Sequence, residues 1–210
     1  MLKEYLNKDI KLNKEQMISI ICSIIVISGV FGWLYEVIFY YFNSGMTQVY
    51  MRGSNFLPWI NIYAYGAFLI ILLTYKRRKH PLQVFLISAI ATGILEYFSG
   101  LILYEKLGLT RCWSYNEEIL NFGNIGGFVC LRSVTFFGLS GLFLIYGILP
   151  FLIYLSNKIN LKLFLIVSIT LASIFLLDEI YNFCLHNIFS LPKASEIYKN
   201  LGLKYIYFER

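Results

Sequence analysis

Charged side chains are scarce in this sequence, because only 14% of its 210 residues are Asp, Glu, Lys or Arg and 58% are hydrophobic. Soluble globular domains carry about 25% charged residues, so the composition excludes that class. Several apolar runs reach the roughly 20 residues that a helix needs to cross a bilayer. The sequence therefore predicts an all-α fold, a polytopic membrane helix bundle with about five transmembrane helices of that length.

Histidine and cysteine are also few, and none of them is spaced like a metal ligand. His80 and His186 lie far apart, and the four cysteines include no Cys-x-x-Cys pair. Because recognisable metal sites have closely spaced ligands, we expect no metal and no cofactor. The sequence also has no Gly-x-x-x-x-Gly-Lys motif followed by Ser or Thr, which excludes a built-in ATPase.

The net charge of +6 is interpreted as a topology signal. Basic residues gather in short segments between apolar runs, without the aromatic interleaving of nucleic-acid-binding surfaces, so no nucleic-acid partner is expected. The densest basic cluster covers residues 76–80. Short cytoplasmic loops of membrane proteins collect Lys and Arg. We therefore expect a multi-pass protein of the cell membrane with this loop and the N-terminus in the cytoplasm, and the side of the C-terminal tail is left open.

The chain divides into three predicted parts. Residues 1–16 form a cytoplasmic segment, which we expect to be retained because the next apolar run is too long for a signal peptide and lacks a small-residue cleavage site. The length and aromatic content of the outer loop, residues 105–131, indicate an ordered cap. The transmembrane bundle is expected over residues 17–182, with helices at about 17–42, 56–75, 82–104, 132–155 and 161–181, followed by a tail over 183–210.

Glu36 and Glu96 are the most informative side chains. Each stands in a stripe of small and polar residues that recurs every fourth position, roughly 10 Å below the outer end of its predicted helix. An intramembrane carboxylate is costly and marks a functional site by default, although a structural partner that neutralises it is the alternative. The stripes are Ser28, Gly32, Glu36 and Tyr40 in the first helix and Ser88, Thr92, Glu96 and Gly100 in the third.

Around these carboxylates we expect a polar cavity that opens outward. Arg132 starts the fourth helix from outside and either reaches a carboxylate or snorkels to the interface. Residues 52–67 form either a helix start with an aromatic belt or the rim of the site. Cys112 and Cys130 share the outer loop, so a disulfide between them is feasible in an oxidising compartment. The candidate binding residues are Glu36, Glu96, Arg132, Tyr63, Asn61, Trp113, Tyr115 and Arg52.

Several short motifs between residues 29 and 150 resemble a known bacterial family. They are Gly32-Trp33-Leu34-Tyr35-Glu36, Arg52-Gly53, Pro58-Trp59, Ile62-Tyr63, Gly66-Ala67, Leu95-Glu96-Tyr97, Ser99, Trp113 with Tyr115, and Asn124 with Gly127, Cys130 and Leu131. The chain resembles the membrane proteins labelled putative ABC-transporter type IV, or CmpB-like. This resemblance implies a multi-spanning permease whose ATPase would be a separate subunit.

The sequence departs from the family pattern at two motifs. Leu57, Asn61 and Ala64 stand where the family's Gly-Pro-x-x-Pro-Ile-Tyr-Gly motif has two glycines and a proline. The family's Trp-Asp-Tyr reads Trp113-Ser114-Tyr115 here, so the acid is missing. An activity that depends on that acid would be lost or altered in this chain.

Three functions follow as hypotheses. The leading one is a permease-like transport or solute-binding component with an outward-opening polar intramembrane site. The second is an intramembrane enzyme acting on a lipid or lipid-linked substrate, with the paired carboxylates as acid and base, so the question of catalysis stays open. The third is a membrane interaction or effector subunit in which the small-residue stripes only join helices. Expected partners are membrane lipids and a separate ATPase or other subunit, and a homo-oligomer is left open.

Overall fold

The computed structural model describes residues 2–7, 10–47, 53, 55–106, 108 and 113–202. Within these residues every regular element is a helix, apart from one antiparallel bridge between Ile125 and Val129. The predicted all-helical membrane bundle is confirmed. By length and composition, four helices can cross a membrane: Lys14–Asn43, Pro81–Lys106, Leu131–Ser156 and Leu161–Phe189. The fifth, α3 (Asn61–Thr74), has 14 residues and is about 21 Å long, shorter than a bilayer core of about 30 Å.

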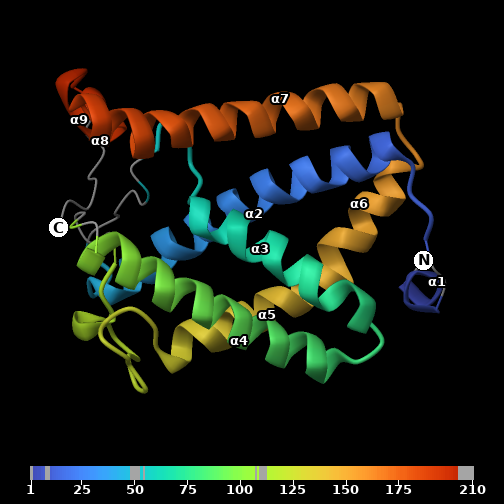
Figure 1. Cartoon of the computed structure of the whole chain (residues 1–210), viewed down its shortest axis with the longest axis horizontal. Coiled ribbons are helices and arrows are strands. Elements are labelled where there is room, and N and C mark those ends of the chain that lie inside the picture. The colour runs from blue at the N-terminus through green and yellow to red at the C-terminus, as the bar shows by residue number, and fades with distance from the viewer. Residues whose placement is uncertain are drawn as a thin grey trace.

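The helices form two pairs with α3 between them (Figure 1). α2 (Lys14–Asn43) packs along α7 (Leu161–Glu179), and α4 (Pro81–Gly100) packs along α5 (Leu131–Phe143). α3 contacts both α2 and α4. This central position buries one face of α3, including Ala64, Ala67 and Ile70, whereas Phe68 and Leu72 on the other face are exposed.

The bundle has two different ends. The basic end holds α1 (Leu2–Asn7), the 3-10 turn η1 (Tyr75–Arg77) and the turn between α6 (Leu149–Ser156) and α7. The cap end holds residues 113–130, which we call the cap, together with α8 (His186–Phe189) and α9 (Ala194–Asn200). Figure 1 shows α1 and α9 at opposite ends of the bundle, so the described part of the tail lies on the cap side.

The start of α2 is fixed by its own sequence and by the end of α6. Asn13 accepts the Gln16 N–H at 2.8 Å, and the Gln16 Oε1 accepts the Asn13 N–H at 3.2 Å, which forms a capping box. The Gln16 amide also donates to the Asn157 Oδ1 at 2.9 Å. One side chain therefore satisfies a helix terminus and joins α2 to the turn after α6.

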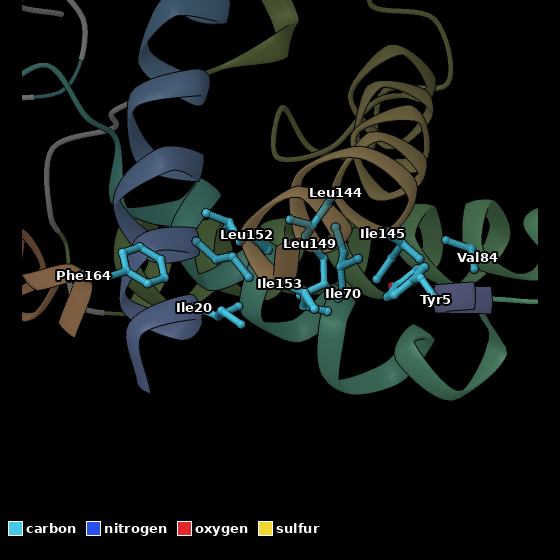
Figure 2. Packing of buried hydrophobic residues seen from close by; sticks show 12 residues of the cluster. Tyr5, Ile20, Ile70, Val84, Leu144, Ile145, Leu149, Leu152, Ile153 and Phe164 are labelled. Carbon is cyan, nitrogen blue, oxygen red and sulfur yellow. The ribbon is translucent and has the colours of Figure 1, made fainter. Parts of the chain in front are cut away.

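A buried apolar cluster fills the basic end (Figure 2). It includes Tyr5 from α1, which is only 2% exposed, together with Ile70 and Ile145. Arg78 holds α1 in place, because its Nε donates to the Tyr5 carbonyl at 2.9 Å and its guanidinium lies 4.6 Å from the centre of the Tyr75 ring. This cation of the basic cluster is buried and serves packing as well as topology.

The helix expected from residue 56 begins instead at Asn61. The preceding backbone is bonded to side chains that compete with the helix. The Asp178 carboxylate, on α7, accepts the N–H groups of Phe56 at 2.9 Å and Leu57 at 3.1 Å. The Asn55 amide donates to the Trp59 carbonyl at 2.9 Å. Non-helical backbone at membrane depth is tolerated where protein satisfies it, and these bonds do so.

The tail covers this non-helical stretch. The α7 helix continues through the π-helical turn η5 (Ile180–Leu185) into α8, and α9 then folds back. The Tyr198 hydroxyl donates to the Phe56 carbonyl at 2.6 Å, and the Asn182 Oδ1 accepts the Ala194 N–H at 3.0 Å. The last described helix thus holds the start of α3 in place.

Two further π-helical turns lie in the other spans. η2 (Leu101–Lys106) continues α4, and η4 (Leu144–Ile148) joins α5 to α6. Pro150 follows η4 and has no N–H to donate to the preceding turn. Single π-helical turns inside long helices are frequent at functional sites, and η4 lines the cavity described below.

Candidate functional site

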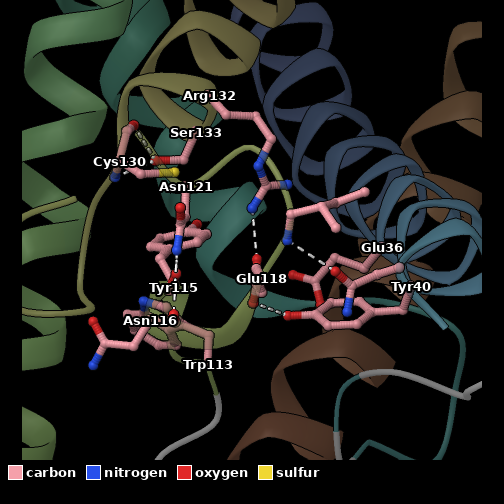
Figure 3. A network of polar contacts seen from close by, with 12 residues as sticks. Glu36, Tyr40, Trp113, Tyr115, Asn116, Glu118, Asn121, Cys130, Arg132 and Ser133 are labelled. Atoms are coloured by element: carbon pink, nitrogen blue, oxygen red, sulfur yellow. Dashed lines mark hydrogen bonds and ion pairs between the residues drawn. The ribbon is translucent and has the colours of Figure 1, made fainter. Parts of the chain in front are cut away.

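Arg132 is the central cation of a polar cluster at the cap end (Figure 3). It lies in the first turn of α5, and its side chain is 13% exposed. Its Nη2 pairs with the Glu118 Oε2 at 2.5 Å, and its Nη1 donates to the Tyr35 hydroxyl at 3.2 Å. The guanidinium lies 3.8 Å from the centre of the Phe39 ring and 5.3 Å from that of Tyr115. Such stacking favours a cation in a site from which water is excluded.

One nitrogen of this guanidinium is unused. The Nε of Arg132 is buried and has no hydrogen-bond partner among the described residues. A buried donor left unsatisfied costs about 1–3 kcal/mol. The pair with Glu118 is therefore monodentate, although a guanidinium can bind a carboxylate through two parallel N–H donors.

Glu118 fastens the cap to two helices of the bundle. Its side chain is 1% exposed, and its Oε2 takes the ion pair with Arg132 of α5. Its other oxygen, Oε1, accepts the Tyr40 hydroxyl of α2 (Figure 3). Removing one partner of a buried ion pair typically costs about 3–5 kcal/mol, because the remaining charge is left uncompensated, so replacing Glu118 or Arg132 alone should destabilise the cap.

Glu96 lies beneath the cap on α4 and is 5% exposed. Its two oxygens are divided between the cap and α5. Oε1 accepts the Tyr115 hydroxyl, and Oε2 accepts the Ser133 hydroxyl at 2.9 Å. Burial and the neighbouring Glu96 charge raise the pKa of Tyr115 well above its ordinary value, so this tyrosine stays a donor to the carboxylate.

Glu36 is bonded from α3. The Tyr63 hydroxyl donates to the Glu36 Oε1 at 3.2 Å. The Tyr63 ring crosses α2 directly against Gly32, where an added Cβ would lie 2.1 Å from the ring carbon Cγ. Glycine is therefore required at this position for Tyr63 to reach Glu36, which gives the small residue of the predicted stripe a specific role.

Aromatic rings connect the two carboxylates to the cation. The Tyr35 ring lies 3.6 Å from that of Phe136 in a stacked pair and 6.4 Å from that of Tyr63. Arg132 therefore reaches Glu36 through Tyr35 and Tyr63, and it reaches Glu96 through Tyr115. These groups therefore form one connected unit.

The cap has an internal framework of its own. The Trp113 Nε1 donates to the Phe128 carbonyl at 3.0 Å, and the Asn124 Oδ1 accepts the Gly127 N–H at 2.8 Å. Gly127 has a φ of +77°, a left-handed conformation that favours glycine. These bonds hold the cap in the shape that aims Tyr115 and Glu118 into the bundle.

A cavity of about 40 Å³ lies among α2, α3, α5 and η4, and it is partly open to the bundle surface beside the exposed rings of Phe31 and Phe143. Ser28, Tyr63 and Ser140 are the polar residues on its wall, and apolar side chains line the rest. A cavity needs about 10–15 Å³ to hold one water molecule, so there is room for water here. Ser28 precedes Glu36 by eight positions, which places the cavity roughly 12 Å nearer the basic end than the cluster.

The structure gathers most of the predicted site residues at the cap end. Glu36, Tyr63, Glu96, Tyr115 and Arg132 belong to the connected unit described above. Trp113 supports the cap, and Asn61 accepts from the Asn55 amide at 3.0 Å at the start of α3, outside that unit. Arg52 lies outside the described residues, and so does Cys112 of the predicted disulfide with Cys130.

Two residues of structural importance were missed by the sequence analysis. Glu118 takes the ion pair with Arg132, whereas we expected Arg132 either to reach down toward Glu36 or Glu96 or to snorkel to the interface. Asp178 organises the start of α3. Two features of the sequence could have indicated these residues. Both are acidic, and Glu118 follows the aromatic motif Trp113-Ser114-Tyr115, whereas Asp178 lies at the end of an apolar run. Within the described residues, no group of three or more His, Cys, Asp or Glu side chains could hold a metal ion.

Comparison with known proteins identifies the family. The family described as putative ABC-transporter type IV matches residues 23–183. The chain belongs to this family. The putative ABC-transporter type IV match covers α2 through α7 and includes Glu36, Glu96, Glu118 and Arg132. With its four long apolar helices, this member is a multi-pass membrane protein related to transport. Neither the comparison with curated proteins nor that with solved structures found a match.

Proposed function

We propose that this chain is a permease-like, solute-binding membrane component whose polar site opens toward the cap side. The site consists of Glu36, Glu96 and Arg132 under a cap closed by Glu118 and Tyr115. By the charge bias of the loops, the cap side is the outer side and the N-terminus is cytoplasmic. Energy would come from a separate subunit, since the sequence contains no phosphate-binding ATPase motif.

The observation that carries this proposal is the double position of Tyr63. Its hydroxyl donates to Glu36 in the polar cluster, and its ring forms part of the cavity wall below. One side chain of the short helix α3 thus separates a charged site near one surface from a small cavity nearer the middle of the bundle. A permease needs such a divider between an outer site and the path beyond it.

The interrupted start of α3 supports the same reading. Transporters often build their sites beside helices that are broken within the membrane, and α3 begins at Asn61 after a non-helical stretch bonded to Asp178. The π-helical turn η4 contributes Leu144 and Ile148 to the cavity wall. Irregular backbone therefore precedes the helix that contributes Tyr63 and also lines the cavity.

Thiol accessibility tests this function without knowledge of the substrate. Ser140→Cys, in a chain whose four native cysteines are replaced by serine, places a thiol on the cavity wall. A membrane-impermeant thiol reagent is added to sealed cells from outside. We expect slow labelling, and labelling at least tenfold faster when Tyr63→Ala removes the divider.

The matched control is Ser168→Cys on α7. Ser168 is 2% exposed and does not line the cavity, and its hydroxyl donates to the Phe164 carbonyl of its own helix at 2.7 Å. If the thiol at position 140 reacts no faster than the one at position 168, even with Tyr63→Ala, no path leads from the cap side to the cavity. The permease function would then be wrong.

A further inference from the structure

The ion pair that closes the site is incomplete on the arginine side. Nε and Nη2 of a guanidinium form one edge that can bind both oxygens of a carboxylate or phosphate group. In Arg132 only Nη2 is used, by Glu118 Oε2 at 2.5 Å, and Nε is buried without a partner among the described residues. Glu118 cannot supply both oxygens, because its Oε1 is bonded to Tyr40.

We propose that Glu118 is an internal substitute for the acidic group of the ligand, and that the site binds a small zwitterion. This proposal rests on the proposed function and names the class of its solute. The ligand's carboxylate or phosphate takes the Nε–Nη2 edge of Arg132 and displaces Glu118. The ligand's ammonium group lies toward Glu36 and Glu96.

The surrounding charges decide for a zwitterion over a simple anion. An anion bound to Arg132 would lie near the carboxylates of Glu36 and Glu96. Tyr115 connects the guanidinium to Glu96. Tyr35 and Tyr63 together connect it to Glu36. Like charges at such range repel. A positive group on the same molecule turns that repulsion into attraction.

Displacement of Glu118 also explains how the ligand would enter. Glu118 joins the cap to α2 and α5 by bonding Tyr40 and Arg132, beside the bond from the Ile119 N–H to Asn43 and that from Tyr115 to Glu96. A ligand that takes over Arg132 removes the attachment of Glu118 to α5. Binding and opening of the cap are therefore one event, and the internal carboxylate sets the affinity by competing with the ligand.

The experiment measures binding to the purified full chain in lipid nanodiscs by the shift of its thermal unfolding midpoint. The probes are pooled L-amino acids, as carboxylate zwitterions, and O-phosphoethanolamine, as a phosphate zwitterion. Amino-acid amides lack the acidic group and N-acetyl amino acids lack the ammonium group. We expect one zwitterion class to bind and both single-charge sets to bind at least tenfold more weakly.

Variants test the role of Glu118. Glu118→Gln keeps the shape and loses the competing charge, so we expect the affinity for the zwitterion to rise at least tenfold. Glu117→Gln, on the exposed neighbouring residue, is the matched control and should leave the affinity unchanged. Arg132→Lys loses the two-donor edge and should weaken binding at least tenfold. If Glu118→Gln does not fold, Tyr40→Phe frees the Oε1 of Glu118 to bind the Nε of Arg132, which strengthens the internal competitor, so this variant should weaken binding.

The result that overturns the proposal is equally definite. The proposed role of Glu118 is wrong if neither zwitterion class binds the wild type or Glu118→Gln. It is also wrong if the affinity for the zwitterion is the same in the wild type, in Glu118→Gln and in Tyr40→Phe. Cavity labelling through Ser140→Cys does not depend on the ligand. A failure here with labelling intact refutes the zwitterion alone, whereas loss of labelling refutes the permease function.

Discussion

Replacing Asp178 by alanine should destabilise the bundle, because two backbone N–H groups more than 100 positions away lose their hydrogen-bond acceptor. The carboxylate accepts the N–H groups of Phe56 at 2.9 Å and Leu57 at 3.1 Å, and the Asn182 amide at 2.7 Å. Phe56 is half-buried and Leu57 is exposed, so each bond counts as an ordinary hydrogen bond of about 0.5–1.5 kcal/mol, and the two together account for about 1–3 kcal/mol of unfolding free energy. Asn182 adds little, because its amide also donates to the Asp178 backbone carbonyl at 3.1 Å.

A graded series measures this effect. Asp178→Asn keeps one acceptor oxygen and should cost about half as much, roughly 0.5–1.5 kcal/mol. Ser168→Ala on the same helix removes a hydroxyl bonded within that helix and should stay within about 0.5 kcal/mol. Unfolding in increasing SDS gives the free energies, and hydrogen exchange reports the amides of Phe56 and Leu57. If Asp178→Ala matches the serine control, or if both amides stay protected, the carboxylate does not hold the start of α3.

Three further predictions follow from the cap and the packing. Gly32→Ala brings a methyl group into the Tyr63 ring and should destabilise the bundle by about 1–3 kcal/mol, as judged by SDS unfolding; an unchanged midpoint would contradict the contact. The raised pKa of Tyr115 implies that its contribution to stability is complete below its ordinary pKa of 10.0 and is lost as the pH rises through the higher folded value. Tyr115→Phe should therefore flatten the fall in unfolding midpoint above pH 10, and an equal fall in both proteins would refute this. A thiol from Lys79→Cys should react only with reagent inside sealed cells and the exposed native Cys184 with reagent outside; the reverse pattern would invert the orientation.

Hydropathy was sufficient to predict the fold class, because the long apolar runs have no stable alternative to membrane helices. Glu36 and Glu96 stood out for a related reason: a carboxylate in an apolar run is conspicuous. Arg132 stood out because it opens such a run. The sequence thus indicated which charged groups would be buried, but their pairing depends on the path of the whole chain.

The errors share one physical cause, which is long-range hydrogen bonding. Glu118 resembles any acidic loop residue until the cap folds and places it against Tyr40, 78 positions away. We expected α3 to start too early because Phe56 and Leu57 belong to an apolar pattern. In the structure their N–H groups donate to the carboxylate of Asp178, more than 100 positions later in the sequence. Local periodicity contains no information about either contact.

The dependence of α3 on Asp178 also sets an order of events during synthesis. The Phe56 amide emerges from the ribosome 122 residues before its acceptor. At about 5–20 residues per second, the delay is roughly 6 to 24 s. During that time the start of α3 must stay in the interfacial region, bond to water or find a temporary partner, because hydrocarbon offers none. The backbone that precedes α3 therefore reaches its final form only after α7 has been inserted.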